Sequence, residues 1–217
     1  MLSTLNASKR ALARGFTLIE LLAVILIISI LVATLTPMVN DAIRSARVTA
    51  CSANLREIHK ALGLYYMQFH TMPKDSGVKF FASVISRKAI EYTKSNAEKL
   101  TCPSVDKGFL ALGALPWEEW WSDLERVDGT YSAYAGRDLK GHPLRQWPPS
   151  GNEPLIADDN EGEANHGQIT NVLYGDGNVH TFVLIELQEQ GKVSKDETNL
   201  VVGPSSPVED LSKLILD

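Results

Sequence analysis

The sequence lacks the motifs by which most enzymes are recognised. None of its serines or cysteines lies in a nucleophile motif, no glycine-rich phosphate loop precedes a helix, and Cys51 and Cys102 lack the C-x-x-C spacing of many metal sites. His166 beside Asp158 or Asp176 would be the best acid–base candidate, but nothing in the sequence names a substrate. We therefore predict that the protein is not an enzyme.

Positive charge is also scarce. The chain of 217 residues has a formal net charge of −5, with 21 lysines and arginines against 26 aspartates and glutamates. Three of the basic residues, Lys9, Arg10 and Arg14, lie close to the N-terminus, so the remainder of the chain is more acidic still. Because an acidic surface repels a phosphate backbone, we expect no nucleic acid partner.

Charge is absent altogether from Leu21 to Asn40. A helix of this length spans about 30 Å, the thickness of the hydrocarbon core of a bilayer. The segment is longer than the apolar core of a secretory signal peptide, and no small-x-small cleavage site follows it. The basic residues before it favour a cytoplasmic N-terminus, although Arg44 and Arg47 on the other side oppose this. We predict one transmembrane helix with the rest of the chain outside.

Two features beside this apolar segment are not needed by an ordinary membrane anchor. Glu20 places a carboxylate just inside the apolar zone, where a charge is costly. The dipeptide Gly15-Phe16 joins the basic leader to the apolar residues. An ionisable residue inside a membrane segment is a candidate functional residue by default, so the segment is predicted to do more than anchor the chain.

This segment resembles the N-terminus of type IV pilins and type II secretion pseudopilins. The resemblance implies that a prepilin peptidase cleaves between Gly15 and Phe16 and methylates the new amino group of Phe16. It also implies that Glu20 neutralises the charged N-terminus of a neighbouring subunit, since a paired buried charge is tolerable where a lone one is not. Pro37 matches a proline at which the long helix of the family kinks or locally melts.

The resemblance further implies the fold, the role and the partners. We expect an α+β, pilin-like fold, in which a long N-terminal spine helix packs on a small antiparallel sheet. The expected role is a structural subunit of a pseudopilus or pilus, inserted in the bacterial inner membrane with a periplasmic head before it enters the filament. The expected partners are the prepilin peptidase, the assembly platform with its ATPase, and further copies of the chain or sister pseudopilins.

The chain divides into four predicted segments. Residues 1–15 form a cytoplasmic leader, 16–40 the membrane half of the helix, 41–72 its amphipathic half and 73–217 the head. In the third segment apolar side chains recur at steps of three and four residues, which predicts one apolar helix face. Pro73 and the turn-forming residues after it end the helix near residues 70–72.

The head is predicted to combine a second helix with a small sheet. Alternating and continuous apolar patterns indicate strands, and the composition of residues 175–178 is typical of a hairpin turn. The predicted helices cover residues 77–100 and 208–216, and the predicted strands cover residues 131–135, 154–157, 171–174 and 179–185.

The two cysteines are predicted to form a disulfide. Cys51 lies on the apolar face of the long helix, and Cys102 follows the end of the second helix. An oxidising compartment permits one disulfide between them, which would join the spine helix to a loop of the head. The alternative is two small buried cysteines.

A second resemblance lies in the head. His166 is followed after nine residues by Asp176-Gly177, and this spacing resembles a subgroup of prepilin-like proteins that is frequent in Planctomycetes and Verrucomicrobia-type bacteria. One interpretation is structural: His166 hydrogen-bonds Asp158 or Asp176 and fixes the hairpin to the loop before it, while Gly175 and Gly177 supply positive φ in the turn.

The other interpretation is a calcium site. Asp158, Asp159 and Asp176, with the side chain of Asn178, would supply the oxygen ligands that calcium prefers. His166 fits such a site poorly, because hard cations favour oxygen. We expect no other cofactor, and the structural interpretation is the preferred one.

Aromatic residues gather between residues 108 and 152. If exposed, they would stack on sugars or dock a partner, which defines an alternative function: a membrane-tethered periplasmic module that binds carbohydrate or a partner protein through these aromatics or the acidic loop. If buried, they would close a small core beneath long loops.

Overall fold

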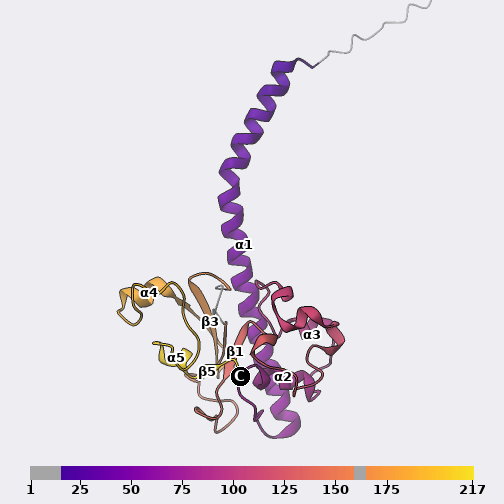
Figure 1. The fold of residues 1–217 in the computed structure, drawn as a ribbon, viewed down its shortest axis with the longest axis vertical. Helices are drawn as coiled ribbons and strands as arrows, with labels where there is room; N and C mark the ends of the chain where they lie inside the picture. Colours follow the sequence, from indigo (N-terminus) through magenta and orange to yellow (C-terminus); the bar gives the residue numbers. More distant parts are fainter. Residues whose placement is uncertain (1–15, 159–164) are drawn as a thin grey trace, which may run out of the picture. The chain divides into compact units, whose positions relative to one another are not determined.

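The computed structural model describes residues 16–158 and 165–217, and its longest element is the helix α1 (Leu18–Phe69) (Figure 1). As predicted, one helix joins the apolar segment to the head. It ends where His70 takes a positive φ of 55°, just before Met72 and Pro73. Pro73 disfavours helix in the residue before it, so the helix has no continuation beyond this turn.

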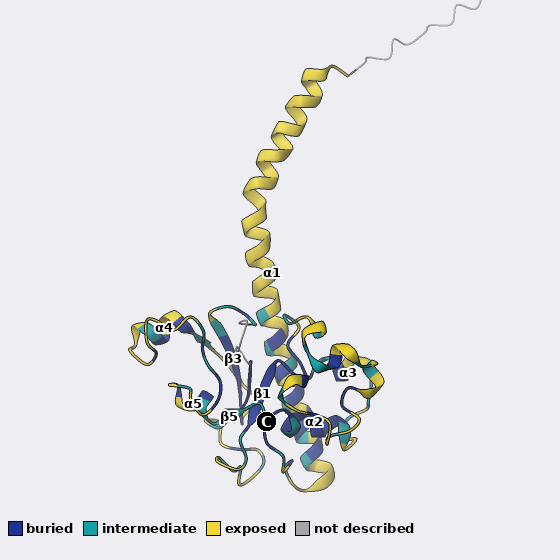
Figure 2. Cartoon of the chain, viewed as in Figure 1, coloured by how far each residue is buried: buried dark blue, intermediate teal, exposed yellow. Residues whose placement is uncertain are grey.

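The chain separates into two compact units, at Ile43 and Arg44 within α1. In the first unit the described side chains are exposed along the whole helix, including every leucine, isoleucine and valine (Figure 2). The helix is long and apolar enough to cross a membrane. Pro37 lies inside it, and the backbone is helical on both sides of the proline, so the local melting implied by the resemblance is not seen here.

The second unit, residues 44–217, is built on a five-stranded antiparallel sheet of order β4-β3-β2-β1-β5. The three strands predicted from residue 153 onward are present, and β1 and β5 extend the sheet at one edge. The strands are β1 (Tyr134–Arg137), β2 (Pro154–Asp158), β3 (Ile169–Tyr174), β4 (Val179–Val183) and β5 (Leu214–Ile215). The α+β, pilin-like fold predicted from the sequence is thereby confirmed.

Each face of the sheet carries its own hydrophobic cluster, because successive side chains of a strand point to opposite faces. Tyr134 and Leu173 belong to the cluster that contains the second half of α1, whereas Ala135 and Val172 belong to the cluster that contains α4 (Leu184–Glu189) and α5 (Glu209–Ser212). In α1 the predicted apolar face is buried at Cys51, Leu55, Ile58, Ala61, Leu62 and Tyr65. The sheet is therefore covered on both faces.

Two helix predictions were wrong in extent. Residues 77–100 form α2 (Val78–Ser86) and α3 (Lys94–Glu98) in place of one helix, because Lys88 takes a φ of 61° between them. Residues 208–216 are divided between the short α5 and the strand β5, which pairs with β1. The long connection before β1 contains four short 3-10 helices: η1 (Lys107–Phe109), η2 (Ala111–Ala114), η3 (Trp117–Glu119) and η4 (Gly129–Tyr131).

Candidate functional site

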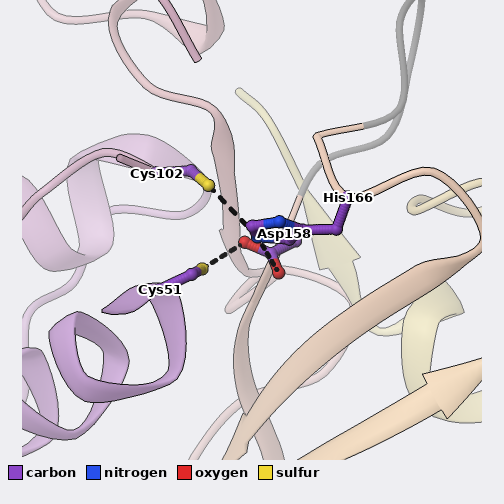
Figure 3. Close-up of side chains that lie close together, drawn as sticks. All are labelled: Cys51, Cys102, Asp158 and His166. Atoms are coloured by element: carbon purple, nitrogen blue, oxygen red, sulfur yellow. Dashed lines mark hydrogen bonds and ion pairs between the residues drawn. The ribbon is translucent and has the colours of Figure 1, made fainter. Parts of the chain in front are cut away.

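Four side chains with metal-binding or acid–base chemistry converge inside the head: Cys51, Cys102, Asp158 and His166 (Figure 3). They come from four segments: the second half of α1, the loop after α3, the end of β2 and the loop before β3. One ligand atom from each lies within 4.8 Å of the others, and all four residues are buried. We call this group the Cys–Asp–His cluster.

The contacts within the cluster run from sulfur to carboxylate to imidazole (Figure 3). The Cys51 thiol donates to Asp158 Oδ1 at 2.6 Å, and Asp158 Oδ2 lies 3.4 Å from His166 Nε2. The same ring nitrogen lies 3.3 Å from Cys102 Sγ. Both the carboxylate and the second sulfur thus approach one atom, Nε2.

The outer contacts of the cluster fix its side chains. His166 Nδ1 is 3.1 Å from the Ser104 hydroxyl, which orients the ring so that Nε2 faces the cluster. Asp158 Oδ2 accepts from the backbone N–H and the side-chain amide of Asn171, at 3.2 and 2.9 Å. The Tyr134 hydroxyl lies 3.3 Å from Cys51 Sγ. Side chains held in this way on strands and a helix are pre-positioned for a shared ligand.

Burial and mutual contact shift the protonation of the cluster. Burial raises the pKa of the Cys51 thiol and raises that of Asp158 to about 7. The neighbouring Cys51, and then His166, lower the pKa of Cys102 to about 5. Burial alone would lower the pKa of His166, but the contact with Cys102 and the charge of Asp158 outweigh it and raise the pKa. The cluster therefore concentrates negative charge on Cys102, next to an imidazole that readily takes a proton.

This arrangement is not that of a cysteine–histidine–aspartate triad. In a triad the nucleophile and the carboxylate contact opposite nitrogens of the imidazole, so that one accepts a proton while the other orients the ring. Here Cys102 and Asp158 both contact Nε2 of His166, and Ser104 contacts Nδ1. Cys102 also has no exposed surface through which a substrate would reach the sulfur. The geometry is that of ligands converging on one point.

The sequence pattern explains why these residues meet. Cys51 lies one turn before Leu55 on the buried face of α1. Asp158 is two residues from Ile156 and Asn171 is two residues from Leu173, so each pair lies on one face of the sheet. Ile156 and Leu173 belong to the hydrophobic cluster that contains α1. The polar side chains at the ends of β2 and β3 are therefore directed toward the helix, where Cys51 lies.

The predicted disulfide between Cys51 and Cys102 is not formed, and both are free buried cysteines. The two sulfurs nevertheless belong to one cluster. Each sulfur has a polar partner in place of the other sulfur: Asp158 for Cys51 and His166 for Cys102. The alternative of two buried thiols is the one that the structure adopts.

Two of the residues proposed as calcium ligands, Asp158 and Asp176, do not come together. Asp158 is buried at the end of β2, whereas Asp176 is exposed in the turn after β3, beside the start of β2. The Asp176 carboxylate accepts from the backbone and side-chain amides of Asn178, at 2.9 and 2.7 Å. Asp159 lies outside the described residues. Among the described residues, Asp158 instead joins His166, as the structural interpretation predicted.

The His-x9-Asp-Gly spacing corresponds to the two ends of β3. His166 precedes the strand and joins the Cys–Asp–His cluster, while Gly177 follows it in the hairpin turn with a φ of 84°. The positive φ predicted for Gly175 as well was wrong. A side chain at Gly177 would collide with the ring of His59 on α1, and His59 Nε2 lies 3.0 Å from the carbonyl oxygen of Gly175. The loop before β3 is therefore linked to Cys51 of α1 through Asp158, and the turn after β3 contacts His59 of the same helix.

Most aromatic residues of the 108–152 region close the core. Trp121 is fully buried and donates to the carbonyl of Ala97 at 2.9 Å, while Trp120 and Tyr131 are nearly so. Trp147 packs against His59, with the two ring centroids 5.0 Å apart. Phe109 is the exception, with 87% of its surface exposed. These contacts favour the core role over an aromatic binding platform.

At the other end of α1, Glu20 takes part in a capping box that the sequence analysis missed. The Thr17 hydroxyl accepts from the backbone N–H of Glu20 at 3.3 Å, and Glu20 Oε2 accepts from the backbone N–H and the hydroxyl of Thr17, at 2.9 and 2.7 Å. The signal was the Thr-x-x-Glu pattern before an apolar run. Phe16 is exposed just before this cap, and Gly15 lies outside the described residues.

Comparison with known proteins identifies the N-terminal segment. Residues 10–36 match the model of the prokaryotic N-terminal methylation motif. No curated protein and no solved structure matches the chain. The motif, together with the long helix on an antiparallel sheet, indicates a type IV pilin- or pseudopilin-like protein. Such proteins are typically structural subunits without enzymatic activity, made as inner-membrane precursors for a prepilin peptidase.

Proposed function

We propose that the protein is a structural subunit of a type II secretion pseudopilus or a type IV pilus. The prepilin peptidase cleaves it after Gly15 and methylates Phe16, and the apolar half of α1 then carries it from the inner membrane into a filament. Its partners are the peptidase, the assembly platform with its ATPase, and further copies of the chain or sister pseudopilins. The methylation motif over residues 10–36 supports the processing step.

One observation carries this proposal: in the first half of α1 every described side chain is exposed. Its leucines and isoleucines have about half or more of their surface exposed all around the helix, and no described residue before Val48 is buried or half-buried. Apolar surface on every side of a helix requires an apolar surrounding, which is lipid in the membrane and other helices in a filament. A subunit that moves from one to the other needs this surface in both places.

Glu20 is the residue that distinguishes a filament subunit from a simple anchor. As part of the capping box it satisfies the backbone N–H of Thr17 within its own chain. In the filament its carboxylate would also neutralise the methylated amino group of a neighbouring Phe16. Pairing removes the cost of two isolated charges in an apolar bundle. Pairing with the neighbouring amino group requires the negative charge of Glu20, whereas capping the helix requires only a neutral oxygen that accepts a hydrogen bond.

The orientation follows from the charges around the helix. Lys9, Arg10 and Arg14 precede it and hold the N-terminus in the cytoplasm, so the head lies in the periplasm. The alternative function, a membrane-tethered binding module, has less support in its aromatic form. That form would require exposed aromatics, and Trp120, Trp121 and Tyr131 lie in the core. Its other form would bind through the acidic loop after β2, most of which lies outside the described residues.

The experiment compares two substitutions of Glu20 in a host with a prepilin peptidase and an assembly system. Glu20→Gln keeps an oxygen that accepts from the N–H of Thr17 but removes the charge, and Glu20→Ala removes both. Glu189→Ala, on the exposed side of α4, is the matched control. The readouts are the mature N-terminus by mass spectrometry and the amount of chain in sheared filaments.

If charge pairing drives assembly, both Glu20 variants are processed normally and both fall at least about tenfold in the filament fraction, corresponding to roughly 1.4 kcal/mol of coupling. Glu189→Ala assembles normally. Normal assembly of Glu20→Gln together with loss in Glu20→Ala would reduce Glu20 to a helix cap. Normal assembly of both would favour the tethered module.

A further inference from the structure

We propose that Cys51, Cys102, Asp158 and His166 bind one Zn²⁺ ion, which fastens the second half of α1 to the sheet. This site is independent of the filament proposal, because all four ligands lie in the second compact unit, residues 44–217. It also differs from the calcium site considered above in three of its ligands, in its burial and in its chemistry. The inference begins from four ligand atoms within 4.8 Å of one another.

The size of the cluster fits a tetrahedral zinc site. With Zn–S bonds of about 2.3 Å and Zn–N or Zn–O bonds of about 2.0 Å, neighbouring donor atoms lie roughly 3.3–3.8 Å apart. The distance from Cys102 Sγ to His166 Nε2 is 3.3 Å, and that from His166 Nε2 to Asp158 Oδ2 is 3.4 Å. The shorter contact of 2.6 Å between Cys51 and Asp158 holds a thiol proton, which metal binding releases.

The ligand set selects the metal. Two sulfurs, one imidazole nitrogen and one carboxylate oxygen are the donors of a tetrahedral zinc site, whereas calcium takes six to eight oxygens. Zinc binds both cysteines as thiolates and Asp158 as a carboxylate, and the divalent ion offsets most of the cost of burying these negative charges.

The outer contacts are those of a metal site. A histidine ligand usually hydrogen-bonds a protein group through the nitrogen that does not bind the metal, and Ser104 occupies this position at Nδ1 of His166. Asn171 holds Asp158 Oδ2 by two hydrogen bonds. The ligands therefore need little rearrangement to bind an ion.

The burial of the ligands makes this a structural site. Cys51, Cys102 and Asp158 have no exposed surface, and His166 is 3% exposed. Four protein ligands leave no open position for water or substrate, which is the arrangement of structural zinc sites. The ion would join four segments that are distant in sequence, and it would keep Cys51 and Cys102 as thiolates in a compartment that favours disulfides.

The test uses the full chain, purified in detergent without chelator. Metal content is measured by inductively coupled plasma mass spectrometry in the native protein and in Cys102→Ser, Asp158→Asn and Asp158→Cys. His180→Ala, which removes an exposed histidine of the same sheet, is the matched control. Asp158→Cys is included because three cysteines and one histidine are a common zinc ligand set.

We expect about one zinc per chain in the native protein, in His180→Ala and in Asp158→Cys, and at least a tenfold weaker retention in Cys102→Ser and Asp158→Asn. Exchange of zinc for Co²⁺ in the native chain gives the visible bands of a tetrahedral ion and near-ultraviolet thiolate-to-cobalt bands. This spectrum needs no variant and is therefore free of any folding defect that a substitution causes. A chelator lowers the melting temperature of the head, and added zinc restores it.

Four results would contradict the proposal. One is a folded native chain that retains no zinc after incubation with it. Another is a disulfide-linked peptide containing Cys51 and Cys102 in that chain. The third is copper or iron in place of zinc, at about one ion per native chain. Equal zinc content in Asp158→Asn and the native protein would remove Asp158 from the ligand set and so contradict the site as proposed.

Discussion

The two halves of α1 differ more than any other two regions of this protein. In residues 18–43 apolar side chains surround the helix and all are exposed, whereas in residues 44–69 one apolar face is buried and Leu64, Met67 and Phe69 lie exposed outside it (Figure 2). No described side chain of the first half is buried. The second half places Cys51, Leu55, Ile58 and Leu62 on one face against the sheet and its covering helices.

The difference shows which partner each half of the helix is made for. A one-sided apolar face is complementary to a single surface, here the head of the same chain. A helix that is apolar all round suits a surrounding that is apolar all round. We infer that the first half is reserved for lipid and neighbouring subunits, and that the two halves contribute independently to stability. The following predictions test this independence.

The largest expected effect comes from one substitution made in each half. Leu55→Ala is expected to destabilise the head by about 2–5 kcal/mol, because Leu55 is fully buried and its truncation leaves a cavity. Leu26→Ala in the first half is expected to change it by less than about 0.5 kcal/mol. Denaturant unfolding in detergent, followed by tryptophan fluorescence, measures the head alone, since all four tryptophans lie there. Equal effects would contradict the independence of the halves.

A smaller effect is expected at Tyr174, whose hydroxyl donates to Asp210 at 2.6 Å. Burial, followed by this contact, raises the pKa of Tyr174 above its usual value. A raised pKa in the folded state gives stability that is present below about pH 10 and is lost as the pH rises further. Tyr174→Phe is expected to cost about 1.5 kcal/mol at pH 8. Above about pH 10 the substitution is also expected to make the free energy of unfolding fall less steeply, by roughly 1 kcal/mol per pH unit.

Denaturant unfolding from pH 8 to 11 checks this pair of effects. All six tyrosines lie outside residues 16–43, so hydrogen exchange in the first half of α1 serves as the internal control. An alkaline slope that is identical in the native chain and in Tyr174→Phe would show that Tyr174 is not protected in the folded state.

The contact between His59 and the hairpin turn is expected to contribute about 1 kcal/mol. His59 Nε2 meets the carbonyl of Gly175 at 3.0 Å, and its ring packs on Trp147. His59→Ala removes both contacts, and Arg56→Ala on the exposed side of the same turn is the control. Chemical denaturation measures the difference. If both variants are equally stable, the hairpin turn is not docked on α1 through His59.

The smallest effect is expected at the capping box of the first half. Thr17→Val removes the hydroxyl that accepts from the N–H of Glu20, which weakens the first turn of α1 by about 0.5–1 kcal/mol. Hydrogen exchange of the amides at residues 18–21 in micelles is expected to accelerate several-fold. The melting temperature of the head is expected to stay the same, and a shift there would show coupling between the halves.

Much of this architecture follows from local signals in the sequence. The absence of charge over residues 21–40 predicted the apolar helix, and the steps of three and four residues predicted its buried face through Leu55, Ile58 and Leu62. The turn at Gly175–Asn178 predicted the hairpin of β3 and β4. In each case one stretch of chain carries the whole signal, because the helix period and the turn chemistry are local.

The parts that were missed depend on long-range contacts. The break at Lys88 and the pairing of β5 with β1 are set by tertiary packing, which no local period encodes. The cluster unites residues 51, 102, 158 and 166. The sequence analysis paired the two cysteines as a disulfide and treated Asp158 either as a partner of His166 or as a calcium ligand. Only the fold shows that β2 ends where Cys51 faces the sheet. The capping box is different, because its Thr-x-x-Glu pattern was visible in the sequence.

The most direct test of the central claim is the mass of the mature N-terminal peptide. The chain is expressed in a host with a prepilin peptidase, recovered from the membrane fraction and digested. We expect a peptide that begins at Phe16 and carries one methyl group on its amino nitrogen, and Gly15→Val is expected to abolish this product. A native chain that still begins at Met1, in a host whose own prepilins are processed, would contradict the account.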